Sequence, residues 1–127
     1  MKNKTIAFLL PNGGFKDCCM ILEHGQYNGY VAIPPEHPLY RASYNSAEIE
    51  QLRVYGGVTF AGGIEQLYGA MKCLDMRIIP SNWWVFGFDT CHYGDNPVSW
   101  DFEAVAQETR RLQQQLEELF AQSKNNQ

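Results

Sequence analysis

The stretch DFEAVAQETRRLQQQLEELFA, from Asp101 to Ala121, decides the fold. Its apolar side chains recur at intervals of three and four residues, which is the spacing of one face of an α-helix. Asp101 can cap the amino-terminal end of that helix. We therefore predict a helix from Asp101 to about Ala121 that buries one stripe of side chains. The stripe consists of Phe102, Val105, Thr109, Leu112, Leu116 and Leu119.

This stripe could pack against the domain's own sheet or against a second copy of the helix. Amphipathic helices of globular proteins usually cover their own core. The pattern spans about two and a half heptads, which is short for an independent coiled coil. We favour packing on the sheet and keep a homodimer through the helix as the alternative.

The segments before this helix have the composition of strands and short helices separated by glycine turns. Two short helices are expected, at 47–52 with Ser46 as the cap and at 64–74. The expected fold class is α+β, with a mainly antiparallel sheet packed against the long C-terminal helix. The predicted strands are 5–10, 17–23, 27–33, 53–55, 58–60 and 83–88.

Length and composition are those of one folded domain. The chain has 127 residues, of which 45% are hydrophobic and 19% charged, and this is enough for one hydrophobic core. We expect a globular domain over 1–122 and a frayed polar tail over 123–127. Ten basic residues stand against fourteen acidic ones, for a net charge of -4. Without a basic excess, duplex nucleic acid is not an expected partner.

The sequence also indicates a cytoplasmic protein. Lys2 and Lys4 precede an apolar run that Pro11 ends, before the length of a secretory signal core is reached. No run approaches the roughly 18 apolar residues of a membrane span, so no membrane partner is expected. The cysteines include an adjacent pair, which favours reduced thiols. They are Cys18, Cys19, Cys73 and Cys91.

Reactive side chains are concentrated in the loop that follows the predicted strand 83–88. Asp89, His92 and Asp95 are spaced by three residues, and two carboxylates with one imidazole are a ligand set of catalytic zinc, manganese and iron sites. A hydrolase that uses a divalent metal at these residues is therefore one hypothesis. Cys91 could act as a nucleophile with a distant base such as His37. In the structural alternative, Asp89 and Asp95 stabilise turns, His92 is a partly buried hydrogen-bond donor and Cys91 is a buried thiol.

A second rigid loop contains His37, because prolines fix the backbone at 34–38. Polar side chains on rigid loops often form sites, so we expect this loop and the 89–95 loop to converge on one cleft. Aromatic side chains could line the pocket, and glycine pairs could admit an anion, although core filling and turns are the simpler roles. The predicted binding residues are His37, Tyr55, Gly56, Gly57, Trp83, Asp89, Cys91, His92 and Asp95.

Three blocks of the sequence resemble a family of small uncharacterised proteins of phages and other mobile elements. The blocks are GYVAIPPEHP at 29–38, YGGVTFAG at 55–62 and WWVFGFDTCHYGD at 83–95. Tyr55 stands where a histidine often occurs in such proteins, and if that histidine is a metal ligand, this chain should bind metal poorly. The residues that match the pattern are His37, Gly56, Gly57, Asp89, His92 and Asp95.

The resemblance implies a biological origin but no biochemical activity. We therefore expect a cytoplasmic binding or accessory protein of phage or mobile-element origin, with a polar and aromatic pocket for a small molecule or a protein partner. The metal-dependent hydrolase at Asp89, His92 and Asp95 is the alternative.

Overall fold

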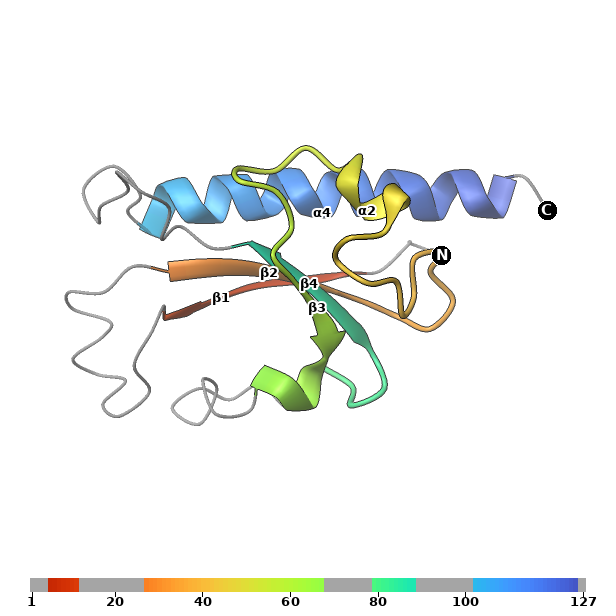
Figure 1. Ribbon diagram of the computed structural model, residues 1–127, viewed down its shortest axis with the longest axis horizontal. Helices are drawn as coiled ribbons and strands as arrows, with labels where there is room; N and C mark the ends of the chain where they lie inside the picture. The colour runs from red at the N-terminus through yellow and green to blue at the C-terminus, as the bar shows by residue number, and fades with distance from the viewer. Residues whose placement is uncertain (1–4, 12–26, 68–78, 89–101, 126–127) are drawn as a thin grey trace.

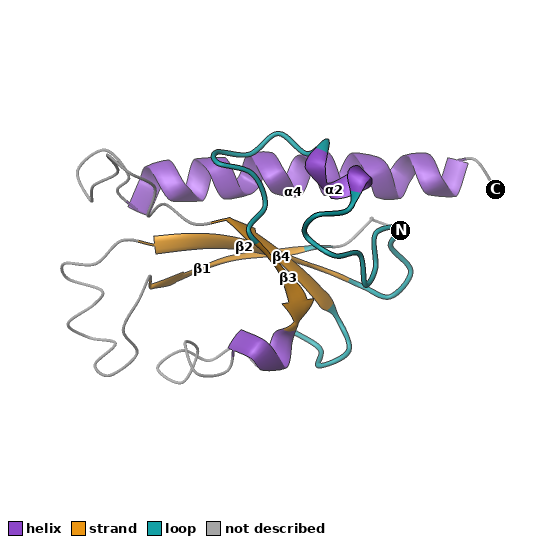
Figure 2. Ribbon diagram, viewed as in Figure 1, coloured by secondary structure: helices purple, strands orange, loops and turns teal. Residues whose placement is uncertain are grey.

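The computed structural model describes residues 5–11, 27–67, 79–88 and 102–125. Its strands form one four-stranded antiparallel sheet in the order β1-β2-β4-β3. Helix α4 lies along one face of the sheet, and η1 lies on the other side (Figure 1). The predicted α+β class is therefore confirmed (Figure 2). The elements are β1 (Ile6–Pro11), β2 (Tyr27–Ile33), α2 (Ala47–Glu50), β3 (Phe60–Gly63), the 3-10 helix η1 (Ile64–Leu67), β4 (Trp84–Phe88) and α4 (Phe102–Asn125).

The two central strands are buried on both faces. Successive side chains of a strand point to opposite faces, so Val31 and Ile33 face α4 while Tyr30 and Ala32 face the η1 side. All of them are at most 8% exposed. This double burial explains why β2 and β4 have nearly continuous apolar sequences rather than a polar and apolar alternation.

Helix α4 covers its own sheet, as predicted. Val105, Leu112 and Leu116 are fully buried, in one core cluster with Val31 and Phe86. The helix approaches β2 closely at Gly29, where a Cβ atom would overlap Thr109 Oγ1 and the Phe88 ring. Thr109 tolerates this burial because its hydroxyl donates to the Val105 carbonyl at 2.7 Å.

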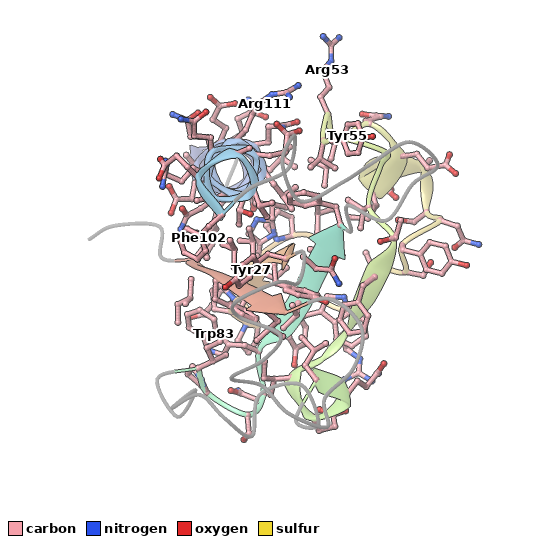
Figure 3. The ribbon with its side chains drawn as sticks, turned by 90° about the vertical axis from the view of Figure 1, so that its left-hand side faces the viewer. Tyr27, Arg53, Tyr55, Trp83, Phe102 and Arg111 are labelled. Atoms are coloured by element: carbon pink, nitrogen blue, oxygen red, sulfur yellow. The ribbon has the colours of Figure 1, made fainter. Side chains whose placement is uncertain are left out.

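The two ends of the predicted stripe need correction. Phe102 was expected to be buried, but it is 55% exposed and contacts Tyr27 edge-on, with ring centroids 5.2 Å apart (Figure 3). It is the first residue of α4, at the edge of the core. At the other end Phe120 is buried, whereas Leu119 is only partly buried. An α-helix has 3.6 residues per turn, so a strict heptad stripe drifts around it and Phe120 replaces Leu119.

Hydrogen bonds tie both flanks of α4 to the rest of the domain. On the β1 side, the Thr5 hydroxyl donates to Glu117 Oε2 at 2.8 Å. On the opposite side, the Arg53 N–H donates to Gln115 Oε1 at 2.7 Å, and Gln115 Nε2 donates to the Arg53 carbonyl at 2.8 Å. We call this reciprocal pair the Gln115 clamp. It holds the segment before β3 alongside α4.

The clamp explains why the predicted strand at 53–55 is wrong. Its backbone groups bind Gln115 and, through the Tyr55 N–H at 2.7 Å, Glu108 Oε2, instead of a neighbouring strand. The strand predicted at 58–60 lies at Phe60–Gly63, so Gly62 and Gly63 belong to β3 and not to a turn. The Gln66 side chain occupies the space where a Gly62 Cβ would lie.

The remaining predicted elements agree with the structure only in part. Ser46 precedes α2, but its hydroxyl donates to the Ser43 carbonyl and makes no capping bond. Of the helix predicted at 64–74, the described part is η1, and α4 continues to Asn125, beyond its predicted end. The strand at 17–23, the cap Asp101 and the four cysteines lie outside the described residues. None of the described helices is long and apolar enough to cross a membrane.

We predict that Leu112→Ala lowers the free energy of unfolding by about 2–5 kcal/mol, because it leaves a cavity in a fully buried site. Phe102→Ala is the matched control on the same helix and should cost less than about 1 kcal/mol, since that ring is already half exposed. Urea denaturation followed by tryptophan fluorescence measures both values. Equal losses would contradict the burial assigned to α4.

Candidate functional site

His37 is an internal bridge between the loop after β2 and helix α4. Its side chain is 2% exposed. The Leu39 N–H donates to His37 Nδ1 at 3.0 Å, so the ring proton must be on Nε2, which donates to the Leu116 carbonyl at 2.7 Å. The ring also packs against Phe120, with centroids 5.0 Å apart. Both ring nitrogens are therefore occupied by backbone partners.

The environment of His37 favours its neutral form. Burial lowers the pKa of His37 below its usual 6.5, although the bond to the Leu116 carbonyl acts in the opposite direction. A neutral ring is what the two bonds require, because a charged imidazole could not accept the Leu39 N–H. The geometry thus agrees with the direction of the shift.

Trp83 and His37 lie on opposite sides of the sheet. Trp83 is partly buried against the core cluster on the η1 side. Figure 3 shows it across the sheet from α4, whereas His37 contacts α4 directly. The described structure does not bring these two predicted binding residues into one cleft.

Asp89, Cys91, His92 and Asp95 lie outside the described residues, and the metal and nucleophile hypotheses stay predictions. The described residues on either side of this segment lie at the same end of β2. Phe88 pairs with Gly29, and Phe102 contacts Tyr27, so both flank the segment at the Tyr27 end of β2. The His37 loop follows the other end, about 20 Å from Tyr27 along the strand. The predicted cleft shared by His37 and His92 stays a prediction, because His92 lies outside the described residues.

Gly56 and Gly57 form a turn. Both have positive φ, 71° and 82°, and the Gly57 N–H donates to the Val54 carbonyl at 2.9 Å. Nothing lies near the position of a Cβ on Gly57, so backbone conformation and not lack of space explains the glycine there. The turn orients Tyr55, whose N–H is bound to Glu108 on α4.

A groove of about 490 Å³ opens between the C-terminal half of α4 and the segment around α2. Leu39, Leu52 and Leu119 supply its apolar surface, and Glu48 and Glu118 supply carboxylates. No lysine or arginine is among its described lining residues. We call it the α4 groove. Its lining consists of Pro38, Leu39, Glu48, Gln51, Leu52, Gln115, Glu118, Leu119, Gln122 and Ser123.

The α4 groove depends on the His37 bridge. The bond to His37 Nδ1 fixes the backbone of Leu39, whose side chain forms part of the groove wall. The bond to Leu116 fixes the loop against the helix turn that precedes Leu119. His37 is therefore connected to this concave region as a positioning residue beneath it, and not as a group that lines it.

Sequence reasoning missed all the residues that line the α4 groove. One indication was present in the sequence of α4. Leu119 is apolar, but the residues around it on the exposed side of the helix have carboxylate and amide side chains. No local pattern indicated that Leu39 and Leu52 would lie opposite. Among the described residues, no group of three or more histidine, cysteine or carboxylate side chains could hold a metal ion.

Comparison with known proteins adds no assignment. No protein family model, no curated protein and no solved structure matches this chain significantly.

We predict that His37 makes stability depend on pH in a defined direction. The unfolded chain binds a proton at His37 near pH 6.5, whereas the folded chain resists it, so acid favours unfolding. The contribution of neutral His37 is fully present above pH 6.5 and is lost as pH falls from 6.5 toward the lower folded pKa.

The comparison is between the parent protein and His37→Gln. The glutamine side chain also offers an N–H donor, but it does not titrate. Urea denaturation between pH 8 and pH 5 should show that the free energy of unfolding falls more steeply for the parent. His24 and His92 are present in both proteins, so their effects cancel. Parallel pH profiles would show that the pKa of His37 is not changed by folding.

Proposed function

We propose that this protein is a cytoplasmic binding protein that takes a short segment of a protein partner into the α4 groove. The observation that carries the proposal is the composition of the groove: an apolar surface from Leu39, Leu52 and Leu119 bordered by the carboxylates of Glu48 and Glu118. Its volume of about 490 Å³ is within the usual range for binding pockets.

The groove chemistry defines the partner segment. One large apolar side chain would cover the leucines, and lysine or arginine beside it would meet Glu48 and Glu118. The amides of Gln51 and Gln122 can each donate to and accept from peptide groups. The segment is therefore apolar at one position and basic next to it.

The expected affinity is modest. Burial of one large apolar side chain contributes roughly 1.5–3 kcal/mol, and each exposed ion pair contributes about 0.2–1 kcal/mol. Part of this gain is offset by the lost freedom of the bound segment. A weak and reversible complex follows, with a dissociation constant of about a millimolar or higher.

The accessory role in a phage or mobile element is also a proposal. It is supported by the three sequence blocks at 29–38, 55–62 and 83–95, and by nothing in the fold. The cytoplasmic location is supported by the adjacent cysteines Cys18 and Cys19, because such a pair favours reduced thiols.

The test uses short synthetic peptides with one leucine between lysines, and the same peptides with glutamates in place of the lysines. NMR of the leucine methyl groups detects contact at Leu39, Leu52 and Leu119. We expect the basic peptide to shift these three signals and the acidic peptide to leave them unchanged, because the groove carries carboxylates.

Two charge reversals on α4 separate the groove from general charge attraction. Glu118→Lys alters the groove, whereas Glu103→Lys makes the same charge change near the start of the helix, where the side chain is 68% exposed. We expect Glu118→Lys to weaken peptide binding about fivefold or more, and Glu103→Lys to have little effect. Equal weakening, or no methyl shifts with any peptide, would contradict the proposed groove function.

A further inference from the structure

A second concave region lies on the other side of the Gln115 clamp. Its volume is about 330 Å³, and its lining consists of Arg53, Val54, Tyr55, Glu108 and Arg111. Figure 3 shows Arg53, Tyr55 and Arg111 on the same side of the molecule, with Arg111 on α4, the other two on the adjoining loop, and the Arg53 side chain extended outward. We call this region the arginine pocket.

Both arginines extend from supports that the fold holds in place. The backbone of Arg53 is fixed on both its N–H and its carbonyl by the Gln115 clamp. The Arg111 guanidinium is oriented by Glu108, to which its Nη1 donates at 3.1 Å and 3.2 Å. This orientation lowers the entropy that the Arg111 guanidinium loses when it binds a ligand.

The charges of the pocket leave an excess for an anion. Glu108 is only 13% exposed, and its carboxylate already accepts from Arg111 and from the Tyr55 N–H. Two guanidiniums and one carboxylate give a local charge of +1 in a chain whose formal net charge is -4. A local excess of this kind attracts a bound anion even when the whole protein is acidic.

The pocket is larger than a simple anion needs. Val54 and Tyr55 add apolar and aromatic surface to its lining, and Tyr55 is partly buried. An aromatic ring carried by the ligand can pack on such a surface while its anionic group reaches the arginines. The planar fork of a guanidinium suits the oxygens of phosphate and carboxylate.

We propose that the arginine pocket binds an oxyanion carried on a small aromatic ring, with Arg53 and Arg111 on the anion and Tyr55 against the ring. This site is independent of the α4 groove and takes ligands of the opposite charge.

The probes are phenyl phosphate, benzoate and inorganic phosphate, each titrated into the full chain at low ionic strength. Binding is measured by shifts of the Tyr55 and Gly57 amide signals. Phenyl phosphate or benzoate should bind at least about fivefold more tightly than inorganic phosphate, because only the first two offer a ring to Tyr55. Equal affinity of all three would overturn the assigned role of the ring, and no binding would overturn the site.

Three variants assign the anion contacts. Arg53→Gln should weaken binding about tenfold, and Arg53→Lys should restore only part of it, since an ammonium lacks the fork. Arg111→Gln should also weaken binding about tenfold. Arg110→Gln is the matched control, because Arg110 is adjacent in sequence but lies near Glu103, at 3.5 Å, outside the pocket.

Urea denaturation checks that each variant is folded, which matters most for Arg111→Gln because it removes a partner of Glu108. Arg53 makes its described hydrogen bonds through the backbone, so Arg53→Gln keeps the test valid if Arg111→Gln fails to fold. Equal weakening by Arg110→Gln and Arg53→Gln would show diffuse attraction and would overturn the pocket. Failure of the basic peptide to bind the α4 groove has no bearing on these results.

Discussion

The bridge made by the neutral imidazole of His37 is the interaction on which the α4 groove depends. It joins the N–H of Leu39 to the carbonyl of Leu116, and so it connects the loop after β2 to the middle of a helix that arises late in the chain. A charged ring could not make both bonds. Because Leu39 and the following turn of α4 form opposite parts of the groove wall, the shape of the groove follows from one protonation state.

Helix α4 makes three kinds of contact, each on a different face. Its buried stripe covers the sheet, its flanks bind Thr5 and the segment at 53–55, and its outer side contributes to both concave regions. The Gln115 clamp lies between these regions. Carboxylates border the groove on one side of the clamp, and guanidiniums border the pocket on the other. One helix therefore borders two concave regions of opposite charge, because the Gln115 clamp holds the loop beside it in place.

Features that depend on neighbouring residues could be predicted from the sequence, whereas features that depend on contacts between distant residues could not. The stripe of α4 and the cores of β2 and β4 could be predicted, because periodicity and composition are local signals. The burial predicted for Phe102 and Leu119 was wrong, because the apolar spacing does not show where the core ends or how an α-helix drifts from a heptad repeat. The role of His37 could not be predicted, because its partner Leu116 is 79 residues away. The same applies to the clamp, which replaced an expected strand at 53–55 with bonds to a helix.

The tautomer of His37 tests the account most directly. Nitrogen-15 and proton NMR of the imidazole at pH 7.5 should show a neutral ring protonated at Nε2, with a slowly exchanging proton coupled across the hydrogen bond to the Leu116 carbonyl. Replacement of Phe120 by alanine should leave the tautomer unchanged, since that contact is one of packing only. A ring that is charged at this pH, or protonated at Nδ1, would contradict the bridge and the groove built on it.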